Sequence, residues 1–203
     1  MSQYFVIHAS HPQQRLLSRA AGILEKGGLV VYPTDTTYAL GCHIGDKAAL
    51  DRIRQVRRLD KQHHFTLTCR DLSEVSAYAR VDNANYRVLR RLTPGPFTFL
   101  LQASREVPRR LVHPRRRTIG LRIPGNAVAR ELLENLGQPM MTTTMRLPGH
   151  DTALTDAQEI RDVLENTVDL IIDGGSCGVV PTTVVDLTGE APLVTRQGLG
   201  VLD

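Results

Sequence analysis

Short apolar runs typical of strands alternate with helical patterns along most of this 203-residue chain. Apolar residues from Leu16 to Leu24 share one helical face, Gly27 and Gly28 can end that helix, and 29–32 then has the pattern of a buried strand. Asp46 can cap a second helix that carries Leu50 and Ile53 inward. Further helices are predicted at 71–79, 83–92, 128–136 and 156–165, and further strands at 65–69, 97–101, 118–123, 140–144, 170–173, 183–186 and 193–196. This alternation predicts an α/β fold in which helices cover a mostly internal sheet.

The last two predicted strands, 183–186 and 193–196, follow each other without a helix between them. Parallel neighbours need a long crossover connection, so part of the sheet should be antiparallel or mixed. The chain is long enough for one substantial core, and we expect a single domain over 1–203.

No apolar run approaches the roughly 20 residues that a membrane-spanning helix needs, and residues 1–12 lack the apolar centre of a signal peptide. The three cysteines, Cys42, Cys69 and Cys177, are odd in number and form no C-x-x-C pair. This usage indicates neither a zinc site nor a disulfide framework, and it favours a reducing, cytoplasmic setting.

Positive charge gathers in two clusters, although the net charge of the chain is only +4. The first cluster contains Arg52, Arg54, Arg57, Arg58 and Lys61, and the second contains Arg109, Arg110, Arg115, Arg116, Arg117 and Arg122. Such clusters attract phosphates, or they form a solvated face that aids solubility. Aromatic residues make up 4% of the chain and tryptophan is absent, which argues against a surface that stacks single-stranded bases.

Hydroxyl side chains follow the predicted strand at 29–32, in the segment from Pro33 to Gly41. Hydroxyls and backbone amides beyond a strand end suit a small polar ligand, although a plain strand and turn would have the same composition. The chain has no P-loop and no G-x-G-x-x-G before a helix, so a nucleotide site would need scattered hydroxyls, amides and arginines. The adjacent His63 and His64 would point apart on a strand, so we do not expect them to bind a metal together, and a solvent-facing loop is the better interpretation of this segment.

Five segments in order resemble the YrdC/YciO family, whose best-known members are threonylcarbamoyl-AMP synthases. The segments are Pro33–Gly41 (PTDTTYALG), Pro94–Thr98 (PGPFT), Thr118–Pro124 (TIGLRIP), Val168–Gly175 (VDLIIDGG) and Pro181–Asp186 (PTTVVD). One match alone would be weak, but five with plausible spacing are a strong signal. The resemblance implies a twisted mixed parallel and antiparallel sheet, with flanking helices, around a large basic cavity.

Family synthases make threonylcarbamoyl-AMP from threonine, bicarbonate and ATP, chiefly by positioning and charge neutralisation. The resemblance implies that Thr34, Arg122 and Thr182 bind the threonyl part of the ligand. It assigns the nucleotide to Arg57, Thr118, Thr142, Thr144, Arg146 and Arg196. Without a ligand, the three strand threonines would also be at home as β-branched residues, and Arg122 could be a structural ion-pair partner. A magnesium ion is expected if ATP is the ligand, but no acidic cluster nominates its ligands and no tightly bound cofactor is implied.

The chain departs from the synthase motifs at four positions. The lysine and arginine of the family's K-x-R pair become Arg57 and Leu59, and the serine and asparagine of its S-A-N triplet become Thr144 and Arg146. This pattern resembles the YciO branch of the family. It places full synthase activity in question, because arginine and lysine are not interchangeable in shape or hydrogen bonding.

Three functions therefore remain open. The first is chemistry on threonylcarbamoyl-AMP related to tRNA modification, either synthesis or hydrolysis of the adenylate. The second is non-catalytic binding of double-stranded RNA or tRNA, and the third is binding or sensing of an adenine nucleotide.

Overall fold

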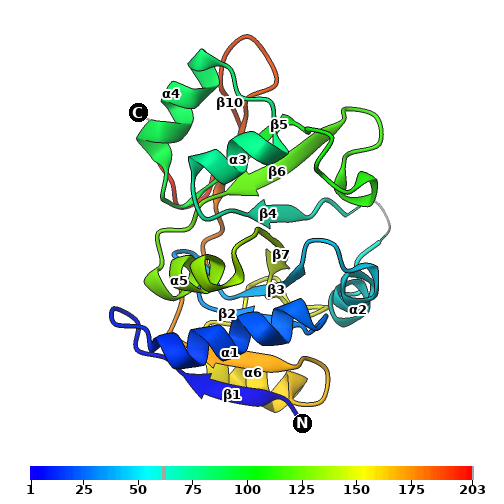
Figure 1. The fold of residues 1–203 in the computed structure, drawn as a ribbon, viewed down its shortest axis with the longest axis vertical. Helices are drawn as coiled ribbons and strands as arrows, with labels where there is room; N and C mark the ends of the chain where they lie inside the picture. The colour runs from blue at the N-terminus through cyan, green and yellow to red at the C-terminus, as the bar shows by residue number, and fades with distance from the viewer. Residues whose placement is uncertain (61–62, 203) are drawn as a thin grey trace.

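The computed structural model describes residues 1–60 and 63–202, and it contains one mixed sheet of ten strands in the order β1-β8-β2-β3-β7-β4-β6-β5-β9-β10 (Figure 1). The strands are β1 (Gln3–Val6), β2 (Val30–Tyr32), β3 (Ala39–His43), β4 (Thr66–Thr68), β5 (Phe97–Gln102), β6 (Thr118–Arg122), β7 (Met140–Thr144), β8 (Leu170–Asp173), β9 (Thr183–Asp186) and β10 (Leu193–Arg196). Lys61, from the first basic cluster of the sequence, lies outside the described residues.

In the described part of the chain, six α-helices flank this sheet. They are α1 (Gln14–Glu25), α2 (Lys47–Arg57), α3 (Leu72–Tyr78), α4 (Asn83–Leu92), α5 (Ala127–Leu136) and α6 (Ala157–Leu164), with a 3₁₀ turn η1 (Arg109–Leu111). Side-chain caps fix several starts: Asp46 accepts from the Ala49 amide at 2.9 Å, as the sequence predicted, and Asn126 accepts from the Ala129 amide at 3.1 Å. Gly137 ends α5 with a φ of 69°, a left-handed value that glycine adopts without strain.

The sheet is mixed, as predicted. Parallel pairs join β1 to β8, β2 to β8, β4 to β6 and β5 to β9, whereas β2–β3, β3–β7, β4–β7, β5–β6 and β9–β10 are antiparallel. The closing hairpin of β9 and β10 therefore has the antiparallel pairing that its short connection requires. All the predicted helices and strands are present, but β1 and β3 were not predicted.

Two apolar clusters hold the helices against the sheet. One joins α1 and α5 to the faces of β2 and β8, with Leu17, Leu24, Leu132 and Leu133 fully buried. Figure 1 shows these two helices side by side across the same part of the sheet. The other cluster packs α2, α3, α4 and α6 against the central strands. Within residues 1–60 and 63–202, no helix is both long enough and apolar enough to cross a membrane.

Candidate functional site

Polar side chains share one face of the central strands. Thr66 of β4 pairs with Gly120 of β6 on one side and with Thr142 of β7 on the other, and Thr68 pairs with Arg122. Because side chains alternate between the two faces of a strand, alternate residues such as Thr118, Gly120 and Arg122 project to the same face. The register thus gathers hydroxyl groups and a guanidinium from β4, β6 and β7 on one surface.

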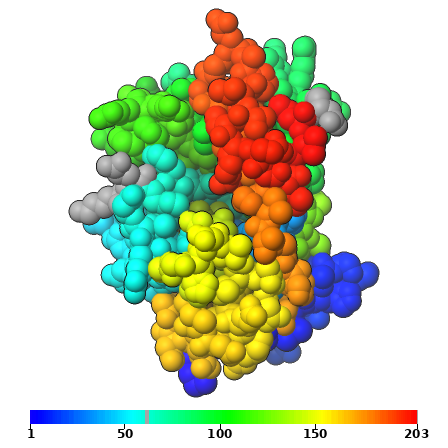
Figure 2. All heavy atoms as spheres, turned by 180° about the vertical axis from the view of Figure 1, so that it is seen from behind, coloured from blue at the N-terminus to red at the C-terminus, as the bar shows by residue number. Residues whose placement is uncertain are grey.

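A cavity of about 220 Å³ lies on this surface, and we call it the threonine cavity. Its walls are Thr37, Ala39, His63, His64, Phe65, Thr66, Thr98, Leu100, Gly120, Arg122, Thr142, Thr143, Thr144, Thr182, Val184 and Arg196. Figure 2 shows the opposite side from Figure 1, where cyan, yellow and orange-to-red segments meet around a recess near the middle. The charged side chains in the walls of the threonine cavity are Arg122 and Arg196, and none of the described wall residues carries a carboxylate. The cavity therefore suits an anionic ligand, although its volume is modest.

The far wall of the threonine cavity is a linked set of hydroxyl groups and Arg196. The Thr98 and Thr182 hydroxyls lie 2.8 Å apart, and Arg196 Nη2 donates to the Thr182 carbonyl at 2.8 Å and to its hydroxyl at 3.1 Å. Arg196 is exposed as a whole residue, but partial burial of its guanidinium lowers its pKa. These contacts hold β10 against β9 and fix a cation at the cavity wall.

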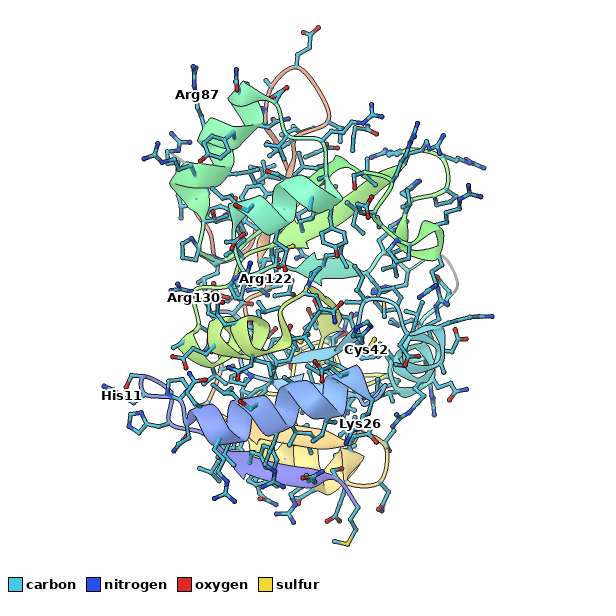
Figure 3. All side chains as sticks on the ribbon, viewed as in Figure 1. His11, Lys26, Cys42, Arg87, Arg122 and Arg130 are labelled. Carbon is cyan, nitrogen blue, oxygen red and sulfur yellow. The ribbon has the colours of Figure 1, made fainter. Side chains whose placement is uncertain are left out.

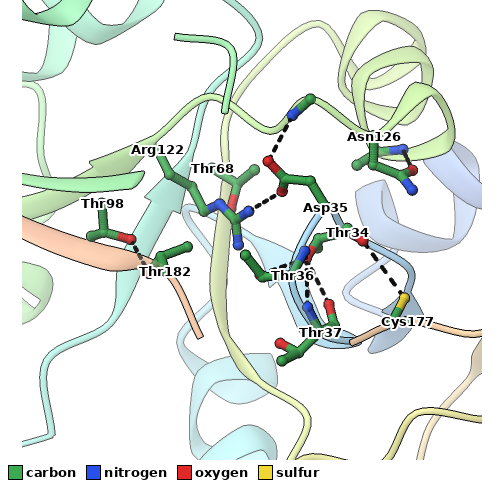
Figure 4. A network of polar contacts seen from close by, with 12 residues as sticks. Thr34, Asp35, Thr36, Thr37, Thr68, Thr98, Arg122, Asn126, Cys177 and Thr182 are labelled. Carbon is green, nitrogen blue, oxygen red and sulfur yellow. Dashed lines mark hydrogen bonds and ion pairs between the residues drawn. The ribbon is translucent and has the colours of Figure 1, made fainter. Parts of the chain in front are cut away.

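Arg122 is held from the opposite side by Asp35. Its Nη2 pairs with Asp35 Oδ1, and Asp35 Oδ2 accepts the Gly125 amide at 3.1 Å (Figure 4). Arg122 Nε is buried and has no hydrogen-bond partner among the described residues. Figure 3 shows Arg122 inside the molecule, in contrast to Arg87 at its edge. Arg122 is thus anchored by one edge of its guanidinium and keeps donor capacity for a ligand.

Thr34 does not line the threonine cavity. Its hydroxyl donates to the Thr37 carbonyl at 2.6 Å and accepts from the amides of Thr36 and Thr37 at 3.2 and 3.3 Å (Figure 4). These bonds form a compact side-chain turn between β2 and β3. In this arrangement Thr34 shapes the loop, and its neighbour Thr37 reaches the cavity wall.

A second cavity of about 310 Å³ adjoins the first and shares His64, Phe65, Leu100 and Gly120 with it. We call it the side lobe. Thr118 lies in this lobe, where the rings of His64 and His113 stack at 4.5 Å. The three strand threonines therefore line different cavities: Thr142 and Thr144 line the threonine cavity, and Thr118 lines the side lobe.

Arg57 and Arg146 lie outside both cavities. Arg57 is buried, and its pKa falls to about 10 because of desolvation and the charge of Arg146. Neither arginine forms an ion pair with a carboxylate among the described residues. Because the two cations repel each other, an anion bound between them would be stabilised. Leu59, which replaces the arginine of the family's K-x-R pair, packs against the apolar core.

The prediction of a solvent-facing loop was wrong for His63. His63 is half-buried and faces the threonine cavity, with Nε2 3.3 Å from the Thr143 hydroxyl. The sequence analysis also missed Thr66, Thr98 and the role of Asp35. Strand parity could have found Thr98, which alternates with buried Phe97 and Phe99, but the pairing partner of Asp35 depends on tertiary structure.

A third hollow, the arginine groove, encloses about 780 Å³ beyond the end of β5. Exposed Arg80, Arg105, Arg109 and Arg117 line it together with Gln102, Ala103, Ser104, Val107, Val112, His113 and Pro114. No carboxylate is among these lining residues. Arg109 and Arg117 of the second basic cluster therefore line this groove, whereas Arg116 lines the side lobe and Arg122 the threonine cavity.

Comparisons with known proteins agree with this fold. The Sua5/YciO/YrdC family model, described as "Telomere recombination", matches residues 22–198. The uncharacterized protein YciO of Escherichia coli K12 is 54% identical over 200 residues, covering 98% of this chain and 97% of that protein. The crystal structure of E. coli YciO matches with a TM-score of 0.95 at 53% identity, over 99% of this chain and 98% of that one.

More distant relatives carry names that describe a reaction. A threonylcarbamoyl-AMP synthase of Pyrococcus abyssi is 28% identical over 181 residues, which cover 88% of this chain and 53% of that protein. The crystal structure of P. abyssi Sua5 complexed with L-threonine matches with a TM-score of 0.89 at 26% identity, over 97% of this chain and 58% of that one.

Proposed function

Because this chain belongs to the Sua5/YciO/YrdC family, we propose that its threonine cavity and side lobe bind threonylcarbamoyl-AMP or a closely related adenine nucleotide. The cavity walls offer hydroxyl groups and two guanidiniums, the donors that phosphate and carboxylate groups require. The related synthases and the threonine complex of P. abyssi Sua5 support a ligand with a threonyl part.

One observation carries this proposal. Residues far apart in the sequence converge on the same small cavity: Arg122, Thr142, Thr144, Thr182 and Arg196. They are supplied by β6, β7 and β10 and by the residue before β9. A purely structural role for strand threonines does not require two arginines in the walls of the same cavity, with no carboxylate among the described wall residues.

The contacts of Arg122 suggest how the ligand is oriented. Its Nη2 is occupied by Asp35 and its Nε is buried, so a ligand carboxylate would use the remaining terminal nitrogen, Nη1. The adenine would then extend past Gly120 into the side lobe, beside Thr118 and the His64–His113 stack. An aromatic stack of this kind offers a flat surface to a purine ring.

The positive charge beside the cavity differs from the synthase pattern. The motif arginine is replaced by Leu59, and Arg146 adds a cation that acts on Arg57. This change conserves charge but moves it, so we propose that the site retains an adenylate without placing pyrophosphate for in-line transfer. The proposal therefore favours binding or breakdown of the adenylate over its efficient synthesis.

The described walls of the threonine cavity do not fit a magnesium ion held by the protein. Magnesium prefers carboxylate oxygens and water, whereas these walls carry hydroxyls, imidazoles and guanidiniums. If ATP binds, we propose that magnesium enters the site bound to the phosphates of ATP. We also propose that the protein works in the cytoplasm, where such nucleotides occur.

Isothermal titration tests the proposal with AMP, ATP and chemically prepared threonylcarbamoyl-AMP. The wild type should bind threonylcarbamoyl-AMP more tightly than AMP, and Arg196→Gln should weaken that binding at least tenfold because a fixed cation is lost. Arg87→Gln, an exposed arginine on α4, is the matched control and should bind as the wild type does. If the wild type binds none of these ligands, the proposal is rejected.

The arginine groove favours a second candidate function, the binding of structured RNA through its phosphates. Duplex RNA is held mainly by phosphate contacts and shape, and the groove offers several arginines without a lining carboxylate. RNA binding would weaken steeply with added salt, whereas adenylate binding would depend little on salt.

A further inference from the structure

The walls of the threonine cavity contain few groups that can take up a proton near neutral pH. Most are hydroxyl, guanidinium or apolar side chains, and no carboxylate, thiol, lysine or tyrosine is among the described wall residues. Two imidazoles, His63 and His64, are the exceptions. Any proton transfer to the protein within this cavity at neutral pH must therefore involve one of these histidines.

His63 is the better placed of the two. It is half-buried, its Nε2 lies 3.3 Å from the Thr143 hydroxyl, and its ring meets Phe65 edge-on at 5.0 Å. His64 is exposed and stacks on His113, so its ring faces the side lobe. The contacts of His63 hold its imidazole against the part of the cavity formed by β7.

The surroundings of His63 keep its imidazole in the neutral form. Burial lowers its pKa, and the charge of Arg57 lowers it further, with smaller effects in the same direction from His64 and Arg54. Asp60 acts in the opposite direction. Since the net shift is downward from the usual pKa of 6.5, His63 can accept a proton at pH 7.

The presence of a proton acceptor distinguishes two reactions of the adenylate. In synthesis, the carboxylate of N-carboxythreonine attacks phosphorus, and a carboxylate needs no base. In hydrolysis, water is the nucleophile and must lose a proton. Building on the proposed adenylate site, we propose that His63 is the general base of a hydrolase that splits the carbamoyl–phosphate anhydride of threonylcarbamoyl-AMP with water.

Water attacks the carbamoyl carbon while His63 takes one of its protons, and the tetrahedral oxyanion collapses with cleavage of the bond between that carbon and the bridging oxygen. AMP leaves with the bridging oxygen and receives the proton from the imidazolium. The other product, N-carboxythreonine, loses carbon dioxide and takes up a proton to give threonine.

Chromatography of products from threonylcarbamoyl-AMP tests this role. We expect the wild type to release AMP and threonine, and His63→Gln to lower kcat by 100-fold or more while AMP affinity stays within threefold. Wild-type kcat should fall as pH drops through the lowered pKa of His63, and the residual activity of His63→Gln should lack that dependence. In water enriched in ¹⁸O, the AMP should remain unlabelled because carbon is attacked.

A matched control is His11→Gln, which replaces an exposed histidine in the loop before α1 and should leave kcat unchanged. Hydrolysis within threefold of wild type in His63→Gln, or a larger loss in His64→Gln, overturns the role of His63. A wild type that binds AMP but does not hydrolyse the adenylate also overturns it, while the proposed binding site stands. A wild type that binds neither ligand overturns both.

Discussion

Arg122 shows how one side chain can be both anchored and available. Asp35 holds one terminal nitrogen, and that carboxylate is itself fixed by the Gly125 amide. The Arg122 and Asp35 side chains are only 10% and 16% exposed, so water screens their attraction poorly. This pair therefore positions the guanidinium before any ligand arrives.

Removing the Asp35 charge should destabilise the protein. In Asp35→Asn the buried guanidinium loses its counter-ion, and we expect the free energy of unfolding to fall by about 3 kcal/mol. Denaturant unfolding followed by circular dichroism measures this loss. The double variant Asp35→Asn/Arg122→Gln should recover part of it, because no unpaired charge remains buried. Equal stability of the wild type and Asp35→Asn would show that the pair is well solvated.

Two of the four departures from the synthase motifs, Leu59 and Arg146, can be reversed together. Leu59→Arg/Arg146→Asn restores the charge positions of the family, and we expect threonylcarbamoyl-AMP formation at least tenfold above the parent. The assay supplies ATP, threonine and bicarbonate, with AMP binding and circular dichroism as controls of integrity. Because Leu59 packs against the core, Arg146→Asn alone is made in parallel. A well-folded double variant with no gain would contradict relocation of charge as the reason for divergence.

The direction of a side chain could be predicted from the sequence only where strand parity determines it. Thr142, Thr144 and Arg122 line the threonine cavity from strands, where alternate residues share a face. Thr34 and His63 lie in loops, where direction follows local hydrogen bonds. The Thr34 hydroxyl is occupied within its own turn, and His63 turns inward to Thr143.

At the scale of elements, β6 supplies much of the cavity floor because its central residue is Gly120. A Cβ atom there would lie 3.2 Å from Thr66 Oγ1 and 3.5 Å from Thr98 Cγ2. Because Gly120 has no side chain, the space between the threonine cavity and the side lobe stays open at this residue.

A larger side chain at position 120 should block ligand binding without unfolding the sheet. Gly120→Val favours strand structure but places methyl groups between the two cavities, and we expect affinity for AMP to fall at least tenfold. Stability should change by no more than about 2 kcal/mol, from close contact with Thr66. The control Gly189→Val lies in an exposed turn where a Cβ atom meets only Ala191 O, at 3.9 Å. Titration calorimetry and thermal unfolding compare the two, and unchanged AMP affinity in Gly120→Val would place the ligand elsewhere.

The elements missed by the sequence analysis have weak local signals. β1 has four residues and lies at the sheet edge, and β3 contains Ala39, Gly41 and His43, which have little strand preference. β3 forms because β2 and β7 pair with it on both sides. Long apolar or alternating runs were predicted correctly, whereas strands that depend on their neighbours were not.

At the scale of the whole molecule, arginines are unevenly distributed over the surface. The arginine groove contains Arg80, Arg105, Arg109 and Arg117, whereas Arg87, Arg90 and Arg91 are exposed on α4. Both sets are solvated, but only the first lines a concave surface. Replacing one set or the other therefore separates the effect of total charge on RNA binding from the effect of where the charges lie.

Replacing groove arginines should weaken RNA binding selectively. For Arg105→Gln/Arg109→Gln/Arg117→Gln we expect duplex RNA affinity to fall at least tenfold, and the slope of log affinity against log salt to flatten by about 2 to 3. Arg87→Gln/Arg90→Gln/Arg91→Gln carries the same charge change and should retain most of the binding. Fluorescence anisotropy across a salt series measures both variants. Equal losses would mean that net charge alone attracts RNA.

The wall that contains Arg196 is contributed by β10, which lies at one edge of the sheet and pairs with β9. Local opening of that edge would carry Arg196 away from the threonine cavity while the rest of the sheet stays folded. An anion that contacts Arg196 would oppose this opening by mass action, so binding would stabilise the edge of the sheet as well as the cavity.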